Sequence, residues 1–314
     1  MAPPARIQVL LAVYNGARYL EAALESLCAQ DFQDWSVLVR DDGSQDGTQA
    51  MLEKWQNRLG TRLQILPNPE NINLGMNKNY SRLLAASTAP YITVISHDDT
   101  YRPNKLSLTL AAMEKREAEV GTNRPILVYT DQVVVNERME VLAASHWKHV
   151  GWHPPKRSPL GRLLVHSAIC GGTCLMNRAL IRLLGERPLC EDVWIALVAA
   201  AFGDLVPLAA QTVNFRWHTS NQSKQVVLGA LVRRVIAAPL SASEILHSQL
   251  DSLRPRARLF LERYRDRLTQ EQIATLQAFL RLPDMGTFAR RRAVLRYGLL
   301  YASWIRTIGL LVLV

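Results

Sequence analysis

Short apolar runs alternate with longer amphipathic segments along the first half of the chain. Apolar runs bounded by turn residues are typical of buried strands, and apolar residues three or four positions apart are typical of helices that face a core. The pattern predicts strands at residues 7–13, 36–39, 63–66, 91–95 and 125–129, and helices at residues 19–29, 48–59 and 78–86. Strands that alternate with helices predict an α/β fold with a Rossmann-like, mostly parallel sheet flanked by helices.

The last third of the chain has a different pattern. Residues 228–280 show helical spacing with many polar positions and lack the turn residues that separate strands, which predicts a C-terminal helical appendage. We therefore expect three parts, at residues 1–224, 225–289 and 290–314.

The final part combines an arginine cluster with an apolar run. Residues 290–292 are all arginine, and residues 297–314 are apolar apart from Arg306 and a few small polar residues. A charge near the middle of a membrane-spanning helix is costly, so an interfacial helix on anionic headgroups is the better prediction. A helix that packs in the core or in a homo-oligomer is the alternative.

Composition adds limits on class and compartment. The chain has 314 residues, 48% of them hydrophobic, and its net charge is +10; residues 225–314 hold 14 arginines, no lysine and six acidic residues. This basic segment lacks interleaved aromatic residues and any known nucleic-acid motif, so no nucleic-acid partner is expected. The N-terminus resembles no signal peptide, and the four cysteines form no CxxC pair. We expect a cytoplasmic protein with reduced thiols, peripheral on the inner face of the cell membrane.

The stretch RDDGSQDGTQAMLE at residues 40–53 allows two interpretations. From Asp42 onward it nearly matches a calcium-binding EF-hand loop, with Gly47 at the turn position and Glu53 at the last ligand position. An EF-hand loop follows a helix, however, whereas the preceding residues DWSVLV have the β-branched, apolar character of a strand. We therefore expect a loop at a strand end whose carboxylates serve another ligand.

Polar residues follow three predicted strands at the point where each strand ends. Because the carboxyl ends of parallel strands meet at one edge of a sheet, where ligands bind, we expect a site there. Adjacent carboxylates suit a hard divalent cation that bridges to phosphates, and neither a P-loop nor a GxGxxG motif occurs. The expected ligands are Mg²⁺ or Mn²⁺ and a diphosphate whose charge the ion neutralises. The residues concerned are Tyr14, Asn15, Asp41, Asp42, His97, Asp98 and Asp99.

Three segments resemble family 2 glycosyltransferases of the GT-A fold, in particular bacterial rhamnosyltransferase-like enzymes that build surface polysaccharide. The segments read LLAVYNGARYLEAALESLCAQDFQDWSVLVRDDGSQDGT, NLGMNKNYSRLL and ISHDDTYRPNKL. The resemblance extends over roughly residues 6–222, with the motifs in the family's order. It implies that residues 1–224 form a nucleotide-sugar-binding and catalytic domain.

The resemblance also implies roles for the strand-end residues. Tyr14 and Asn15 would lie beside the nucleotide, and Asp42, assisted by Asp41, would bond to a pyrimidine base.

Two further motifs would hold the ribose, the metal and the diphosphate. The family often has DQDD where this chain has SHDD at residues 96–99, so two acids remain. Asp98 would lie near the ribose and Asp99 would be the metal ligand. The segment FRWH resembles the family's YRxH, which implies that Arg216 and His218 contact the diphosphate.

The acceptor side resembles the family as well. In HSAICGGTCLMNRAL the glycines let the backbone approach the sugar closely, and CEDVW matches the acidic motif that opens a helix. This implies that Asp192 is the general base of an inverting transfer. The alternative is a favourable charge in the first turn of a helix. The other acceptor residues would be Gly171, Gly172, Thr173, Glu191 and Trp194.

These expectations combine into a metal-dependent, inverting glycosyltransferase. It would move a sugar from a nucleotide-diphosphate donor, with rhamnose from dTDP-rhamnose favoured, to a hydroxyl of a lipid-linked saccharide. A sugar-nucleotide pyrophosphorylase would need a glycine-rich N-terminal loop with Arg and Lys, which VYNGARYL does not provide. A non-catalytic basic adaptor, binding membrane or RNA through the tail, would not need Asp99 or Asp192.

Overall fold

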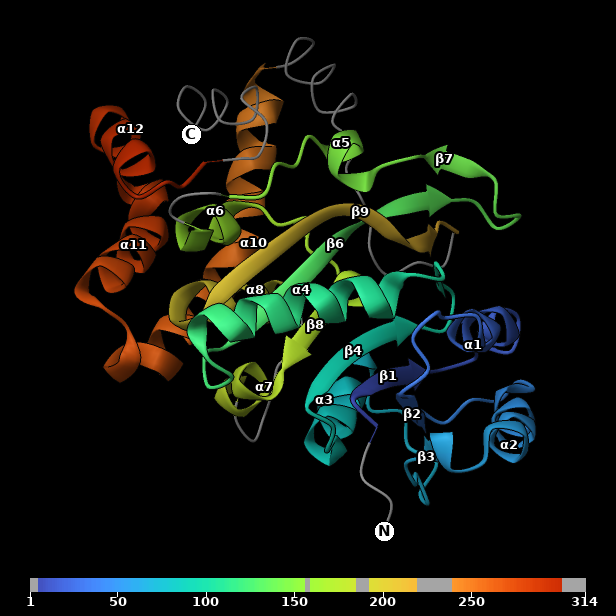
Figure 1. The fold of residues 1–314 in the computed structure, drawn as a ribbon. Coiled ribbons are helices and arrows are strands. Elements are labelled where there is room, and N and C mark those ends of the chain that lie inside the picture. Colours follow the sequence, from blue (N-terminus) through green and yellow to red (C-terminus); the bar gives the residue numbers. More distant parts are fainter. Residues whose placement is uncertain (1–4, 156–158, 185–191, 219–238, 301–314) are drawn as a thin grey trace. The chain divides into compact units, whose positions relative to one another are not determined.

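The computed structural model describes residues 5–155, 159–184, 192–218 and 239–300 (Figure 1). By their internal contacts the residues divide into two compact units, Met1–His146 with Ile169–Ser220 and Trp147–Ala168 with Asn221–Val314. The prediction placed one boundary at residue 224. In the structure, the inserted segment Trp147–Ala168 also groups with the second unit.

The first unit is built on one sheet. The described strands are β1 (Ile7–Val13), β2 (Trp35–Asp41), β3 (Leu63–Ile65), β4 (Tyr91–Ser96), β5 (Thr100–Tyr101), β6 (Ile126–Val135), β7 (Val141–Ala143), β8 (Cys174–Asn177) and β9 (Asp204–Arg216). Their order is β3-β2-β1-β4-β8-β6-β9-β5, with β7 paired to β6. The longest pairings, β1 with β2 and β4 and β6 with β9, are parallel, while β5, β7 and β8 pair antiparallel. The mostly parallel α/β sheet is confirmed.

Helices cover this sheet. They are α1 (Leu20–Cys28), α2 (Thr48–Leu59), α3 (Met76–Ala86), α4 (Lys105–Val120), α7 (Arg178–Leu184) and α8 (Asp192–Phe202), with short 3-10 turns at Gly60–Arg62 and Gly171–Thr173. Figure 1 shows α4 lying across the sheet, and its residues contact β6, β8 and β9.

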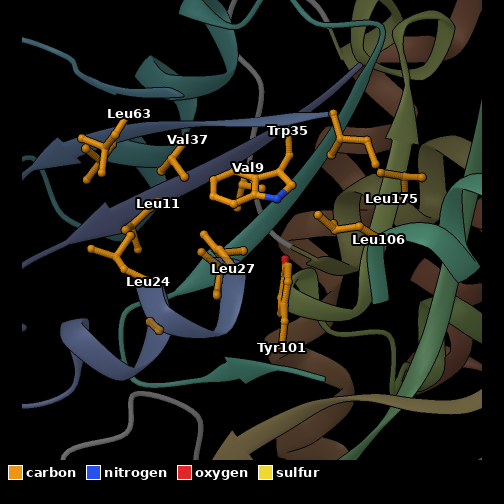
Figure 2. Packing of buried hydrophobic residues seen from close by; sticks show 14 of the residues in the cluster. Val9, Leu11, Leu24, Leu27, Trp35, Val37, Leu63, Tyr101, Leu106 and Leu175 are labelled. Carbon is orange, nitrogen blue, oxygen red and sulfur yellow. The ribbon is translucent and has the colours of Figure 1, made fainter. Parts of the chain in front are cut away.

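All residues of β1 are buried, and one face of the strand lies in the hydrophobic core. Its odd-numbered residues, among them Val9 and Leu11, are fully buried in one cluster with Leu24 and Leu27 of α1 and with Trp35 of β2 (Figure 2). Burying this apolar surface is the main favourable term that holds α1 on the sheet.

The predicted and observed elements agree closely where the pattern is strong. The predicted strand 7–13 and helix 48–59 coincide with β1 and α2. The strand predicted at residues 125–129 continues to Val135 as β6, because residues 130–135 are buried as well. Helix α4 was not foreseen.

The second unit is helical. It contains α6 (Pro159–Val165), α10 (Pro239–Tyr264), α11 (Gln270–Arg281) and α12 (Thr287–Arg296), with 3-10 turns at Arg265–Arg267 and Leu282–Asp284, and α5 (His146–Val150) begins at its boundary. Helix α6 contacts α10 and α11. No helix in the described part of the chain is long and apolar enough to span a membrane. Residues 301–314, most of the expected interfacial helix, lie outside the described residues.

Candidate active site

The ends of β1, β2 and β4 lie level at one edge of the sheet. In the parallel register Val13 pairs with Asp41 and Ala12 pairs with Ser96, so the polar residues that follow these strands meet there. The end of β9 joins the same edge, because the Arg216 backbone N–H donates to Asp99 Oδ1 (2.9 Å). Polar groups from the three strands of the predicted pattern thus converge, and the end of a fourth strand, β9, joins them.

The loop DDGSQDGT holds the turn between β1 and α1. The side chains of Ser44, Asp46 and Thr48 accept the backbone N–H groups of residues 15, 17 and 16, at 2.8, 3.1 and 2.9 Å. Asn15 has a φ of 48°, in the left-handed region that Asn adopts more readily than most residues. The loop follows a strand, so the EF-hand interpretation, which requires a preceding helix, is wrong.

Asp42 is bonded within the protein. Its carboxylate accepts Arg40 Nη1 (2.6 Å) and the backbone N–H groups of Leu74 (2.9 Å) and Gly75 (2.8 Å) at the start of α3. Arg40 also donates to Asn79 Oδ1 (3.1 Å), and Asn79 Nδ2 returns a bond to the Arg40 carbonyl. Asp42 is only 2% exposed. The network therefore ties the end of β2 to α3 and occupies the side chain that was expected to bind the base.

Asp41 is more accessible than Asp42. It is half-buried, and its Oδ1 accepts the backbone N–H (3.2 Å) and the hydroxyl (2.5 Å) of Ser44. Its Oδ2 has no hydrogen bond within the described residues. Nearby, Tyr14 is 45% exposed. Of the two adjacent aspartates, Asp41 has an oxygen left for a ligand.

Asp98 lies beside a histidine, an arginine and an aromatic ring. His218 Nε2 lies 2.9 Å from Asp98 Oδ2, and Arg216 Nε donates to the Asp98 carbonyl (2.8 Å). The Tyr19 ring stacks on His218 with centroids 5.5 Å apart and lies 4.6 Å from the Arg216 guanidinium carbon. Burial works against ionisation of Asp98, but the adjacent His97 and the hydrogen bonds to the carboxylate outweigh it and lower its pKa. The edge therefore carries an ionised carboxylate beside an arginine.

Asp99 has room for a metal ion on one oxygen. Burial, and then the charge of Asp98, raise the pKa of Asp99 well above its usual value. Within the described ranges, no group of three or more His, Cys, Asp or Glu is placed to hold a metal ion. Mg²⁺ is nevertheless often held by one or two carboxylates plus substrate phosphates, and Asp99 Oδ2 has no hydrogen bond to the described residues. These residues fit an ion that takes most of its ligands from a diphosphate.

Asp192 begins α8, and its carboxylate lies against Gly171. A Cβ atom on Gly171 would come within 2.6 Å of Asp192 Oδ1, so only glycine leaves the carboxylate in this position. The charges of Asp192 and Asp99 both add to the burial that raises the pKa of the Cys170 thiol. Asp192 and the expected metal ligand, Asp99, are therefore both near enough to Cys170 for their charges to affect its thiol.

The other expected acceptor residues differ in how far they are buried. Gly171 and Gly172 are half-buried, whereas the side chains of Thr173 and Trp194 are 1% and 0% exposed. Thr173 Oγ1 donates to the Cys170 carbonyl (2.7 Å). Both side chains support the site from inside and do not line it. Glu191 lies outside the described residues.

Sequence reasoning missed several residues that organise the site. Arg40 and Asn79 form the network around Asp42, and Tyr19 packs against Arg216 and His218. A signal for Arg40 was available, because an arginine at the end of an apolar strand is almost never buried without a partner. Nothing local marked Tyr19, which begins the amphipathic pattern predicted at residues 19–29 and immediately precedes α1.

Solved structures with a similar fold contain bound nucleotides and nucleotide sugars. TarS of S. aureus, solved with UDP-GlcNAc, has a TM-score of 0.53 and 17% identity, over 90% of this chain and 82% of that one. The mannosyltransferase PcManGT of Pyrobaculum calidifontis, solved with GDP-Man and Mn²⁺, has a TM-score of 0.50 and 16% identity, over 94% and 88%. At such identities the likeness concerns the fold, which is a GT-A-like α/β fold with a helical C-terminal region.

The family follows from the sequence comparisons. The model described as glycosyl transferase family 2 matches residues 8–184, more than half of the chain, so the chain belongs to glycosyl transferase family 2. An uncharacterized glycosyltransferase of Rickettsia typhi is 25% identical over 185 residues, which are 57% of this chain and 52% of the relative. One of Mycoplasma pneumoniae is 31% identical over 117 residues, 37% and 39% of the two chains. The chain spans about half the length, or less, of these curated relatives.

Proposed function

We propose that this family 2 protein is an inverting, metal-dependent glycosyltransferase. It moves a sugar from a nucleotide-diphosphate donor to a hydroxyl of a lipid-linked saccharide in bacterial surface polysaccharide synthesis. The observation that carries the proposal is the pairing of Asp192 with Gly171 in the region of Asp99. This arrangement supplies a carboxylate base next to the backbone of a glycine, in the same region as the residue suited to the metal.

Each group has a role in the proposed transfer. Asp192 takes the proton from the acceptor hydroxyl as that oxygen attacks the anomeric carbon, on the face opposite the departing diphosphate. Asp99 would hold Mg²⁺ or Mn²⁺, and the ion would neutralise the charge on the diphosphate. Arg216 provides positive charge for the phosphates, and Arg216 and His218 can both donate hydrogen bonds to them. Asp98 lies near the ribose.

We propose a different residue for the contact with the base. Because the Asp42 carboxylate is occupied by three internal donors, we assign the base contact to Asp41 and its free oxygen, with Tyr14 and Asn15 beside it. Asp42 then supports the pocket by holding α3.

The donor and the location are finer proposals. The resemblance to rhamnosyltransferase-like enzymes favours dTDP-rhamnose. The exposed face of α12, with Phe288 and Leu295 at 83% and 65% exposure beside Arg291 and Arg292, supports attachment to an anionic membrane surface. Arg290 does not belong to that face, because its guanidinium donates to the carbonyls of residues 282, 283 and 285.

Calorimetric titration of the purified protein with dTDP, UDP and GDP, each with and without Mn²⁺, tests the proposal. We expect metal-dependent binding of one pyrimidine diphosphate. Asp192→Asn should abolish transfer and leave that affinity within about twofold, since the base does not contact the nucleotide. Absence of binding to all three nucleotides would favour the basic adaptor, and equal loss of binding and transfer in Asp192→Asn would remove its role as base.

A further inference from the structure

A pocket lies at the tip of the β6–β7 hairpin, next to the end of β9. Its volume is about 370 Å³, near the lower end of the range for small-molecule sites, roughly 300–1,000 Å³. Apart from His218, none of its residues has a role in the proposed transfer. The described residues that line it are Asn136, Glu137, Arg138, Glu140, Trp217 and His218.

The hairpin that forms one wall is held in a defined conformation. Asn136 Oδ1 accepts the backbone N–H groups of Arg138 (2.9 Å) and Glu140 (3.0 Å), and Asn136 Nδ2 donates to Glu140 Oε2 (2.6 Å). Glu137 is fixed on both sides, since its carboxylate pairs with Arg18 (2.8 Å) and its carbonyl accepts Arg216 Nη1 (2.9 Å). A preformed wall loses little conformational freedom when a ligand binds.

The opposite wall is aromatic. The Trp217 backbone N–H donates to the Val135 carbonyl (2.7 Å), which continues the β6–β9 ladder and fixes the position of the residue. Phe215 packs edge-on against the indole, with ring centroids 6.4 Å apart. Trp217 is half-buried and lines the pocket.

The charges identify the class of ligand. Among the described lining residues are two carboxylates, Glu137 and Glu140, and one guanidinium, Arg138, and the carboxylates would repel a phosphate placed beside them. Each carboxylate uses Oε2 within the protein and leaves Oε1 without a bond to the described residues. Carboxylate oxygens accept hydroxyl protons, a guanidinium donates to hydroxyl oxygens, and an indole face packs on the C–H face of a pyranose. We propose that this pocket is a binding subsite for a neutral saccharide.

The position of the pocket suggests which saccharide binds. His218 lines the pocket and also lies 2.9 Å from Asp98, so the pocket adjoins the edge where the donor is proposed to bind. A sugar unit of the acceptor glycan, remote from the reacting hydroxyl, would occupy it. This last assignment rests on the proposed function, whereas the binding of a neutral sugar does not.

The test is titration of the full chain, labelled with ¹⁵N-tryptophan, with neutral monosaccharides and disaccharides and with inorganic phosphate. The chain has seven tryptophans, so the Trp217 indole signal can be assigned from Trp217→Phe. We expect at least one sugar to shift the Trp217 signal saturably, while phosphate does not.

Variants tie the binding to the pocket. Glu140→Gln and Arg138→Ala should each weaken the sugar affinity on the order of tenfold, because each removes a charged hydrogen-bonding group. The matched control Glu53→Gln, which changes an exposed carboxylate on α2, should leave it unchanged. Unchanged signals of the other tryptophans establish that each variant is folded.

The outcomes separate this proposal from the proposed function. Failure of every sugar to shift the Trp217 signal, binding that survives both pocket variants, or tighter binding of phosphate would each overturn the subsite. Sugar binding in a protein that binds no nucleoside diphosphate would keep the subsite and remove the glycosyltransferase. Nucleotide binding without sugar binding would keep the proposed glycosyltransferase and remove the subsite.

Discussion

The two adjacent aspartates at the end of β2 have separable roles, and paired substitutions should distinguish them. Asp42 is 2% exposed and Arg40 is 5% exposed, and their ion pair (2.6 Å) is supported by two backbone N–H donors from the start of α3. Asp42→Asn keeps the shape of the side chain but leaves a buried guanidinium without its counter-charge. Breaking a buried pair from one side costs about 3–5 kcal/mol. This is a large share of a typical stability of about 5–15 kcal/mol.

Asp41→Asn should have the opposite profile. Asp41 is half-buried, and its Oδ1, which the amide oxygen of Asn can replace, accepts both bonds from Ser44. We expect a change of less than about 1 kcal/mol in the free energy of unfolding. The affinity for the nucleoside diphosphate should fall about tenfold or more, because a charged acceptor for the base is lost.

The assay combines urea unfolding with calorimetry on the same preparations. Hydrogen exchange of the Leu74 and Gly75 amides reports directly on the contact that Asp42 makes. Asp42→Asn should accelerate the exchange of these amides and lower the unfolding midpoint. A variant with wild-type stability and wild-type exchange that no longer binds nucleotide would place the Asp42 carboxylate on the ligand and refute this reasoning.

Three further predictions follow from other buried or exposed positions. Burial lowers the pKa of Lys105 from 10.5 to about 7. Between these values the unfolded chain binds the proton that the folded chain has released, so stability relative to Lys105→Met should rise about 1.4 kcal/mol per pH unit above pH 7 in urea unfolding. Gly171→Ala should reduce the transfer rate on the order of a hundredfold with unchanged nucleotide affinity, because the new methyl displaces the Asp192 carboxylate. The double substitution Phe288→Ser with Leu295→Ser should reduce co-sedimentation with phosphatidylglycerol vesicles, since it removes exposed apolar area from α12.

Each of these changes has a matched control. Lys54→Met alters an exposed lysine. If this substitution changes the pH dependence of the unfolding free energy as much as Lys105→Met does, burial of Lys105 is not the cause. A Cβ on Gly172 meets nothing closer than 3.8 Å, so Gly172→Ala should retain transfer, and equal loss in both glycine variants would exclude the specific clash. Val141 and Leu142 are also exposed, at 62% and 56%. If their substitution releases vesicles as well, general hydrophobicity and not α12 determines binding.

Much of the first unit follows from local patterns. The strand at residues 7–13 and the helix at residues 48–59 were predictable because a turn-bounded apolar run and helical spacing are both visible in consecutive residues. The convergence of Tyr14, Asp41 and Asp98 at one edge was predictable too, since parallel strands end on the same side.

Burial and pairing at the site were not predictable in this way. Asp41 and Asp42 are adjacent and chemically identical, yet one keeps a free oxygen and the other accepts from Arg40, Leu74 and Gly75. Which aspartate is occupied depends on a helix that begins more than thirty residues later in the chain. In the same way, the family's motif order pointed to Trp194 as an acceptor residue, but packing in the fold leaves it 0% exposed.

The sequence by itself determined the α/β class, the sheet edge that carries the site and the types of side chain gathered there. These depend on periodicity and on turn chemistry, which act over a few neighbouring residues. Only the tertiary structure decided that Asp41 is the accessible aspartate, that Gly171 lies under the Asp192 carboxylate and that Trp217 forms the wall of a pocket. These features arise from contacts between segments far apart in the chain. The local sequence pattern does not show which polar groups such long-range contacts will occupy.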